Sequence, residues 1–183
     1  MKTMDFLKSN IKKRITVYGL ILLAGFITSF VNSFSHPAII LFTPGMLFGL
    51  ALTIPHFDQS RKQIIALVTL PFLMTLICIF TLGLGFGLGI TNNSYSDKTG
   101  VVVVGIISSL LFTFIIDKYY PIENKKTSFI IIVILGISSA LICDYFFLTP
   151  NSKELNFGKM IFIWEAIVGF GLTMFVKFTW MNK

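Results

Sequence analysis

Two acidic residues, Asp144 and Glu165, lie inside long apolar stretches of the 183-residue sequence. Burying an ionisable group at the centre of a bilayer costs about 2.5 to 3.5 kcal/mol on insertion scales, so such a group is a functional hypothesis by default. Two carboxyl groups close together are suited to carrying a proton, binding a cation or recognising an amine-bearing solute. The structural alternative is that each acid reaches interfacial water or accepts hydrogen bonds from neighbouring Ser, Thr or Tyr side chains.

Other residue types that carry chemistry are few. His36 falls in the predicted turn between the first two apolar stretches and could join Asp144 and Glu165 in a metal site. A single histidine without a spacing signature does not specify such a site, so we expect no metal and no cofactor. Cys78 and Cys143 form no C-x-x-C pair. The sequence has no Ser/His/Asp set and no H-E-x-x-H motif, so we expect a protein that is not an enzyme, with a lipid-acting enzyme as the alternative.

The composition places these residues in a membrane protein. The chain is 55% hydrophobic and only 13% charged, whereas soluble domains are about 25% charged. Its apolar residues come in blocks of roughly 16 to 27, the length needed to cross a hydrocarbon core about 30 Å thick. Backbone polar groups in lipid must be satisfied within each segment, so these blocks are expected to be helices. We predict an all-α, polytopic membrane bundle forming a single transmembrane domain, with six transmembrane helices over residues 15–33, 38–57, 64–90, 101–116, 129–148 and 159–179.

The distribution of basic residues predicts the orientation. If the N-terminus is inside, all fifteen lysines and arginines except Lys98, Lys153 and Lys159 lie on the inner side. The net charge of +7 therefore belongs to membrane orientation and not to nucleic-acid binding. We expect both termini to be cytoplasmic in a bacterial cytoplasmic (inner) membrane. Tyr145 and Trp164 fall near the predicted outer boundary, where aromatic belts form.

The predicted segments also give a depth for the two acids. Asp144 lies about four residues from the outer end of its segment and Glu165 about six, which at about 1.5 Å per residue is roughly 6 to 9 Å. A short connection makes these last two segments antiparallel neighbours. The sequence therefore predicts a carboxyl pair at nearly one depth that opens outward.

Small residues spaced four apart recur along the predicted helices. In lipid, close approach through such residues is the main packing device. We expect helix-packing faces within the bundle, with an oligomer interface as the alternative. The predicted packing positions are Gly25, Ser29, Ser33, Gly45, Gly49, Gly105, Ser109, Gly136, Ala140 and Gly169.

A weak internal similarity indicates two halves. Residues 77–88 (ICIFTLGLGFGL) resemble residues 161–172 (IFIWEAIVGFGL). Three helices in each half would make a 3+3 inverted repeat, an arrangement that recurs in transporters with sites at the repeat interface.

In length and predicted topology the chain resembles the substrate-binding S components of energy-coupling factor vitamin transporters. The alanine-spaced contact motif of that family is replaced on the first predicted helix by Gly25, Ser29 and Ser33. The leading hypothesis is a transport or solute-binding subunit with an outward-facing polar site at Asp144 and Glu165. Its expected partners are the lipid bilayer, a second copy or another subunit, and a small solute or cation.

The alternative function belongs to another class. Short loops and a basic inner face are also typical of a non-catalytic, oligomeric membrane sensor or partner subunit that signals to a cytoplasmic protein, for example in stress or phage defence.

Overall fold

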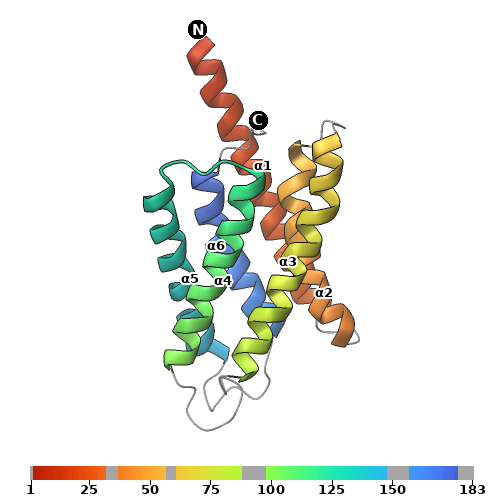
Figure 1. Ribbon diagram of the computed structural model, residues 1–183, viewed down its shortest axis with the longest axis vertical. Coiled ribbons are helices and arrows are strands. Elements are labelled where there is room, and N and C mark those ends of the chain that lie inside the picture. The colour runs from red at the N-terminus through yellow and green to blue at the C-terminus, as the bar shows by residue number, and fades with distance from the viewer. Residues whose placement is uncertain (1, 32–36, 57–60, 88–97, 148–156, 177–183) are drawn as a thin grey trace.

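The computed structural model of the chain describes residues 2–31, 37–56, 61–87, 98–147 and 157–176 (Figure 1). These residues form six α-helices and one short 3-10 helix, with a single isolated bridge between Ile122 and Val176 and no strand in the described ranges. The all-α prediction is therefore confirmed. The elements are α1 (Lys2–Val31), α2 (Pro37–Thr53), η1 (Ile54–His56), α3 (Arg61–Gly87), α4 (Lys98–Tyr119), α5 (Lys125–Phe147) and α6 (Phe157–Phe175).

Within the described part of the chain, five helices are long and apolar enough to cross a membrane: α1, α3, α4, α5 and α6. The helix α2 is shorter, with 17 residues, and contains Pro44. The structure thus confirms a helical bundle of membrane-spanning character, and the sixth crossing by α2 stays a prediction.

Some helix bounds differ from the predicted ones. The helix α1 begins at Lys2, well before the predicted start at residue 15, because the basic N-terminal segment that precedes the apolar stretch is helical as well. Likewise α4 runs from Lys98 to Tyr119 and includes polar residues at both ends. Hydropathy identifies the part of a helix suited to lipid, whereas the helix itself continues until its backbone hydrogen bonding stops.

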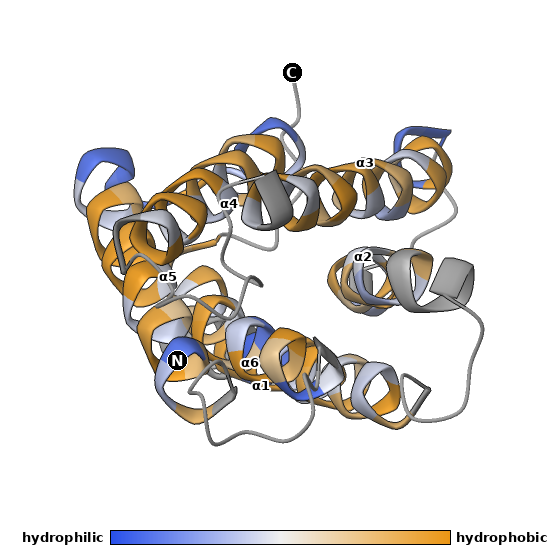
Figure 2. Cartoon of the chain, turned by 90° about the horizontal axis from the view of Figure 1, so that it is seen from below, coloured by the Kyte–Doolittle hydropathy of each residue, from blue (hydrophilic) through white to orange (hydrophobic). Residues whose placement is uncertain are grey.

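The six helices form a closed ring. Each helix packs against the next along the chain, and α6 packs against α1 to complete the ring. Figure 1 shows that successive helices run in opposite directions, and Figure 2 shows the ring along its axis. Large apolar side chains cover the outside, including Phe26, Phe72 and Ile130, each more than 60% exposed. An apolar outer surface on this scale is what contact with lipid requires, because it would be a liability in water.

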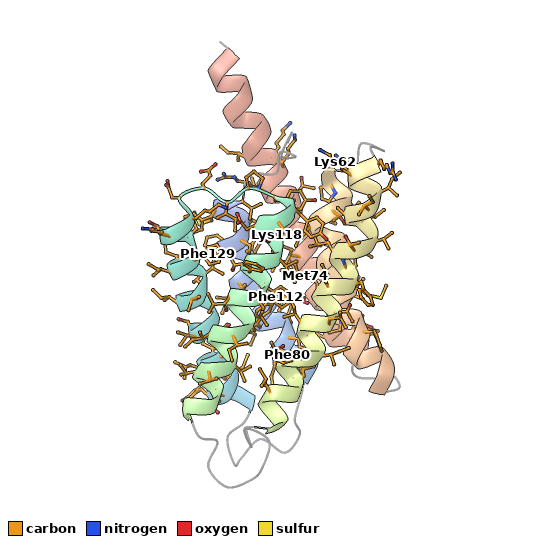
Figure 3. The ribbon with its side chains drawn as sticks, in the orientation of Figure 1. Lys62, Met74, Phe80, Phe112, Lys118 and Phe129 are labelled. Carbon is orange, nitrogen blue, oxygen red and sulfur yellow. The ribbon has the colours of Figure 1, made fainter. Side chains whose placement is uncertain are left out.

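Three aromatic rings fill the centre of the ring of helices. Phe48 of α2 lies 5.4 Å from Phe112 of α4, centroid to centroid, and Phe112 lies 4.6 Å from Trp164 of α6. Phe48 and Trp164 are 6.3 Å apart. In Figure 3, Phe112 lies at mid-height of the bundle, close to the level of Met74 on α3. We call these three residues the aromatic cluster; it joins α2, α4 and α6 across the interior.

Glycines let two pairs of neighbouring helices approach closely. A Cβ added to Gly45 would collide with the Thr75 backbone of α3, and one added to Gly49 would collide with the Pro71 backbone. Between α4 and α5, a Cβ on Gly105 would lie 2.9 Å from the carbonyl oxygen of Gly136. These glycines therefore sit where no side chain fits, because the obstacle is backbone.

The other predicted packing positions lie in similar places. Ser109 is fully buried and donates to the Gly105 carbonyl at 2.6 Å, and Ala140 lies 3.1 Å from a Cβ built on Gly105. A Cβ on Gly169 would lie 2.7 Å from Cγ2 of Ile21 on α1. Ser29 is half-buried on α1, and Ser33 lies outside the described residues. The glycines named here already pack against neighbouring helices of the same chain. An oligomer interface would therefore need other residues.

One end of the bundle is fastened by the α4–α5 loop, residues 120–124. The Tyr120 hydroxyl donates to the Leu52 carbonyl of α2 at 3.2 Å, and the Glu123 amide donates to the Phe175 carbonyl of α6 at 2.8 Å. The Glu123 carboxylate pairs with Arg14 of α1 at 3.2 Å. This loop therefore ties α1, α2 and α6 together at one end, which we call the basic end.

Replacing Tyr120 by phenylalanine is expected to lower the free energy of unfolding by about 1 kcal/mol, because a buried carbonyl loses its donor. Tyr119→Phe is the matched control, since Tyr119 is half-buried and its partner Thr69 also donates to the Ile65 carbonyl. Unfolding by SDS titration of the purified variants measures both effects. Equal losses in the two variants would contradict a fastening role for Tyr120.

Candidate functional site

Glu165 lies near the middle of α6 and faces the interior of the bundle. Its side chain is 2% exposed, and its Oε2 atom has no hydrogen-bond partner among the described residues. A Cβ built on Gly25 of α1 would lie 2.8 Å from this oxygen. Glycine at position 25 therefore makes room for the carboxyl group between α1 and α6.

The immediate surroundings of this carboxyl are mostly apolar. The Phe162 ring also lies against Gly25, 2.8 Å from the built Cβ position. Cys78 of α3 is close enough to Glu165 for the two side chains to interact electrostatically. Among the described residues, the ion pairs of Arg14 with Glu123 and of Lys125 with Asp117 do not involve Glu165.

A second buried polar atom without a partner is Oγ1 of Thr28 on α1. Thr28 is 1% exposed and lies three residues beyond Gly25, on the same face of the helix. Threonines inside helices usually donate back to a carbonyl one turn earlier. Four other buried threonines do so, at 2.6 to 3.0 Å: Thr53, Thr75, Thr81 and Thr113. The hydroxyl of Thr28 makes no such bond to a carbonyl of its own helix.

Two further such atoms among the described residues are Nε1 of Trp164, the residue before Glu165, and Oδ1 of Asp117, whose other oxygen pairs with Lys125 near the basic end. The Trp164 ring packs against Phe112 in the aromatic cluster, inside the bundle. We call Thr28, Trp164 and Glu165 the Glu165 site. Buried polar groups are almost always hydrogen-bonded, so three orphaned atoms on two packed helices need an explanation, such as a bound water or ligand.

Asp144 lies elsewhere along the bundle. It is half-buried, three residues before the end of α5 at Phe147, whereas Glu165 is eight residues after the start of α6 at Phe157. At about 1.5 Å per residue these depths are roughly 4 and 12 Å. The neighbouring Cys143 thiol lies 3.4 Å from the Met160 carbonyl, which sets Asp144 about one and a half turns from the level of Glu165. The sequence predicted nearly equal depths for Asp144 and Glu165, whereas the helices place the two acids at different depths.

The remaining predicted site residue is His36, which lies outside the described residues. Within the ranges that the structure describes, no group of three or more His, Cys, Asp or Glu residues is placed to hold a metal ion.

Sequence reasoning found Glu165 because a charge in an apolar segment is visible in the sequence. It missed Thr28, since nothing in the sequence distinguishes one threonine of a membrane helix from another. The signal that was available was its spacing of three from Gly25, a residue already assigned to a packing face.

Comparison of the chain with protein-family models, with curated proteins and with solved structures gives no match.

Proposed function

We propose that the chain is a small, multi-pass membrane transport or solute-binding subunit whose polar site is centred on Glu165. The observation that carries this proposal is the burial of a carboxyl oxygen without a partner inside an otherwise apolar bundle. An acid retained only for packing would be expected to have its oxygens hydrogen-bonded, because an unsatisfied buried group costs about 1 to 3 kcal/mol. An acid retained for binding meets its partner only when the ligand is present.

The chemistry of the site favours a small solute with an amine or another cationic group. The Glu165 carboxylate accepts hydrogen bonds from such a group, the Thr28 hydroxyl both donates and accepts, and the Trp164 indole donates. Aromatic faces close to a carboxylate add cation–π attraction. The site therefore offers complementary contacts to a cation that also carries an acceptor.

The proposed membrane arrangement has six crossings, with both described ends of the chain on the cytoplasmic side. The helices α1 and α3 run in the same direction along the bundle (Figure 1), so the chain returns between them through α2. Basic side chains gather at the fastened end, where Figure 3 labels Lys62 and Lys118. Positive charge of this kind favours the cytoplasmic side, in a bacterial inner membrane. Glu165 would then be reached from outside.

Glu165→Gln tests this proposal, because it keeps the size of the side chain and removes the charge. We expect a panel of small primary, secondary and quaternary amines to contain at least one that raises the melting temperature of the purified wild-type protein. The same amine should bind Glu165→Gln at least about tenfold more weakly, a loss of about 1.4 kcal/mol. Uptake of that amine into vesicles should fall in parallel.

Asp144→Asn serves as the matched control, since it removes a carboxylate at another depth on α5. It should weaken binding less than Glu165→Gln does. Equal stabilisation of wild type and Glu165→Gln by the amine would overturn the proposal.

A further inference from the structure

The interior between Glu165 and the basic end is packed mainly with aliphatic side chains. Each of the six helices contributes a fully buried aliphatic residue to this part of the core, and together we call them the apolar layer. Its members are Ile21, Leu52, Leu70, Ile116, Ile132 and Leu172, all 0% exposed. The buried threonines on this side, Thr53, Thr113 and Thr173, already donate to carbonyls of their own helices, so this part of the core offers a water few hydrogen-bonding partners.

Beyond the apolar layer, the α4–α5 loop holds the helix ends together. Tyr120 is fully buried and bonded to Leu52, a member of the layer, and Glu123 joins Arg14 to the end of α6. The basic end is therefore closed twice, first by aliphatic packing and then by polar contacts.

The opposite direction from Glu165 is different. Thr28 lies between the level of Glu165 and the end of α1 at Val31, and its buried hydroxyl has no partner. A hydroxyl both donates and accepts, so it passes a proton along or holds a water beside a carboxyl group. The polar atoms of the site thus lead from Glu165 toward the end where α1 finishes and α6 begins.

The number of ligands at the site decides between a proton and a metal ion. A metal ion needs more oxygen ligands than one carboxyl and one hydroxyl supply. A proton needs only the carboxyl oxygen and a water or hydroxyl beside it.

We propose that Glu165 binds and releases a proton, and that it exchanges this proton through Thr28 with one side of the membrane only, the side opposite the basic end. On binding, a hydronium ion gives its proton to the carboxylate, leaving water and a neutral carboxyl group; release is the reverse. This inference rests on the proposed function, since it concerns the protonation of the same carboxyl group that is proposed to bind the solute.

Other titratable groups also lie on the helices packed around α6. Cys78 faces Glu165 from α3, Cys143 and Asp144 lie on α5 nearer the open side, and Lys159 is exposed at the start of α6. On α1 and α4 the described charged side chains lie toward the basic end: Lys12, Lys13, Arg14, Asp117 and Lys118. The described side chains of α2 and η1, residues 42–55, include none that is titratable. Asp144 is therefore the acid whose contribution to a pH response has to be separated from that of Glu165.

Trp164 provides the measurement, because it adjoins Glu165 and is the only tryptophan left after Trp180→Phe. The single-tryptophan protein is reconstituted into vesicles, and its orientation is measured by protease cleavage of a C-terminal tag. A pH jump outside the vesicles should change the Trp164 emission at once only in the molecules whose open side faces outward. Nigericin, which equalises the pH, should then produce the remaining change.

Variants show which residues cause the change in Trp164 emission. Glu165→Gln should abolish both phases, and Asp144→Asn should retain them. Thr28→Val should slow the immediate phase at least about tenfold, and Thr28→Ser should restore it. Thr173→Val is the matched control, since Thr173 is a buried threonine on the closed side whose hydroxyl is bonded to the Phe170 carbonyl. It should leave the rate unchanged.

Three results would overturn the inference: an immediate change in every molecule, equal rates for Thr28→Val and Thr173→Val, or a pH response that survives in Glu165→Gln. No solute is present in this experiment. A proton signal without amine binding would therefore sink the proposed function alone, and amine binding without a proton signal would sink the inference alone.

Discussion

Replacing Gly45 and Gly49 together by alanine is expected to lower the free energy of unfolding by about 3 kcal/mol or more, because overpacking costs about 1 to 3 kcal/mol at each site. The added methyl groups meet the backbone of α3 at Thr75 and Pro71, which cannot turn aside as a side chain does. The helices α2 and α3 would have to separate along their whole contact. SDS titration of the purified double variant measures the loss.

Two other glycines provide the control for this experiment. A Cβ built on Gly19 of α1 or on Gly83 of α3 meets nothing within 4 Å. Alanine at both positions is expected to leave stability unchanged or to raise it by about 1 kcal/mol, because alanine is the better helix former. A control variant as unstable as the α2 variant would show that close approach to the α3 backbone does not explain the loss.

Replacing Glu165 by leucine is expected to raise the free energy of unfolding by about 1 to 3 kcal/mol while abolishing amine binding and the Trp164 response to pH. The stabilising part follows because the substitution removes a buried oxygen that has no partner, which costs about that much in the native protein. Glu165→Gln keeps a polar group in the same place, so it should lose function without the gain in stability. A binding residue commonly costs its protein stability in this way.

The measurement is again SDS titration, here with both variants beside the wild type. A structural acid would behave in the opposite way, since cutting its hydrogen bonds would destabilise the fold. A clear loss of stability in Glu165→Leu, with amine binding and the pH response retained, would assign Glu165 to packing.

The membrane helices could be located from sequence because lipid imposes a length and a composition on each of them. The residues of α3, α4 and α5 that the sequence assigned to lipid lie largely within the observed helices. The start of α1 at Lys2 could not be predicted in this way. Its first turns are basic and polar, so their helical state is independent of the apolar pattern.

The register between helices explains what else the sequence did not predict. The depth of Asp144 relative to Glu165 depends on how α5 slides along α6, and long-range packing fixes that, for example Gly171 against Leu135. Depth read from the ends of two apolar stretches ignores this sliding. The inward turn of Trp164 has a similar cause, because its partner Phe112 belongs to a helix more than fifty residues earlier in the chain.

The α4–α5 loop also bears on how the chain assembles during synthesis. Arg14 and Glu123 are separated by 109 positions, and the amide of Glu123 reaches a carbonyl at the last residue of α6. The bond of the loop to α6 and the contact of α6 with Gly25 form only once α6 is in place. A chain in which α6 has not yet joined the bundle would be an open horseshoe of helices, with Gly25 of α1 uncovered. The helix α6 is therefore both the carrier of Glu165 and the segment that closes the ring.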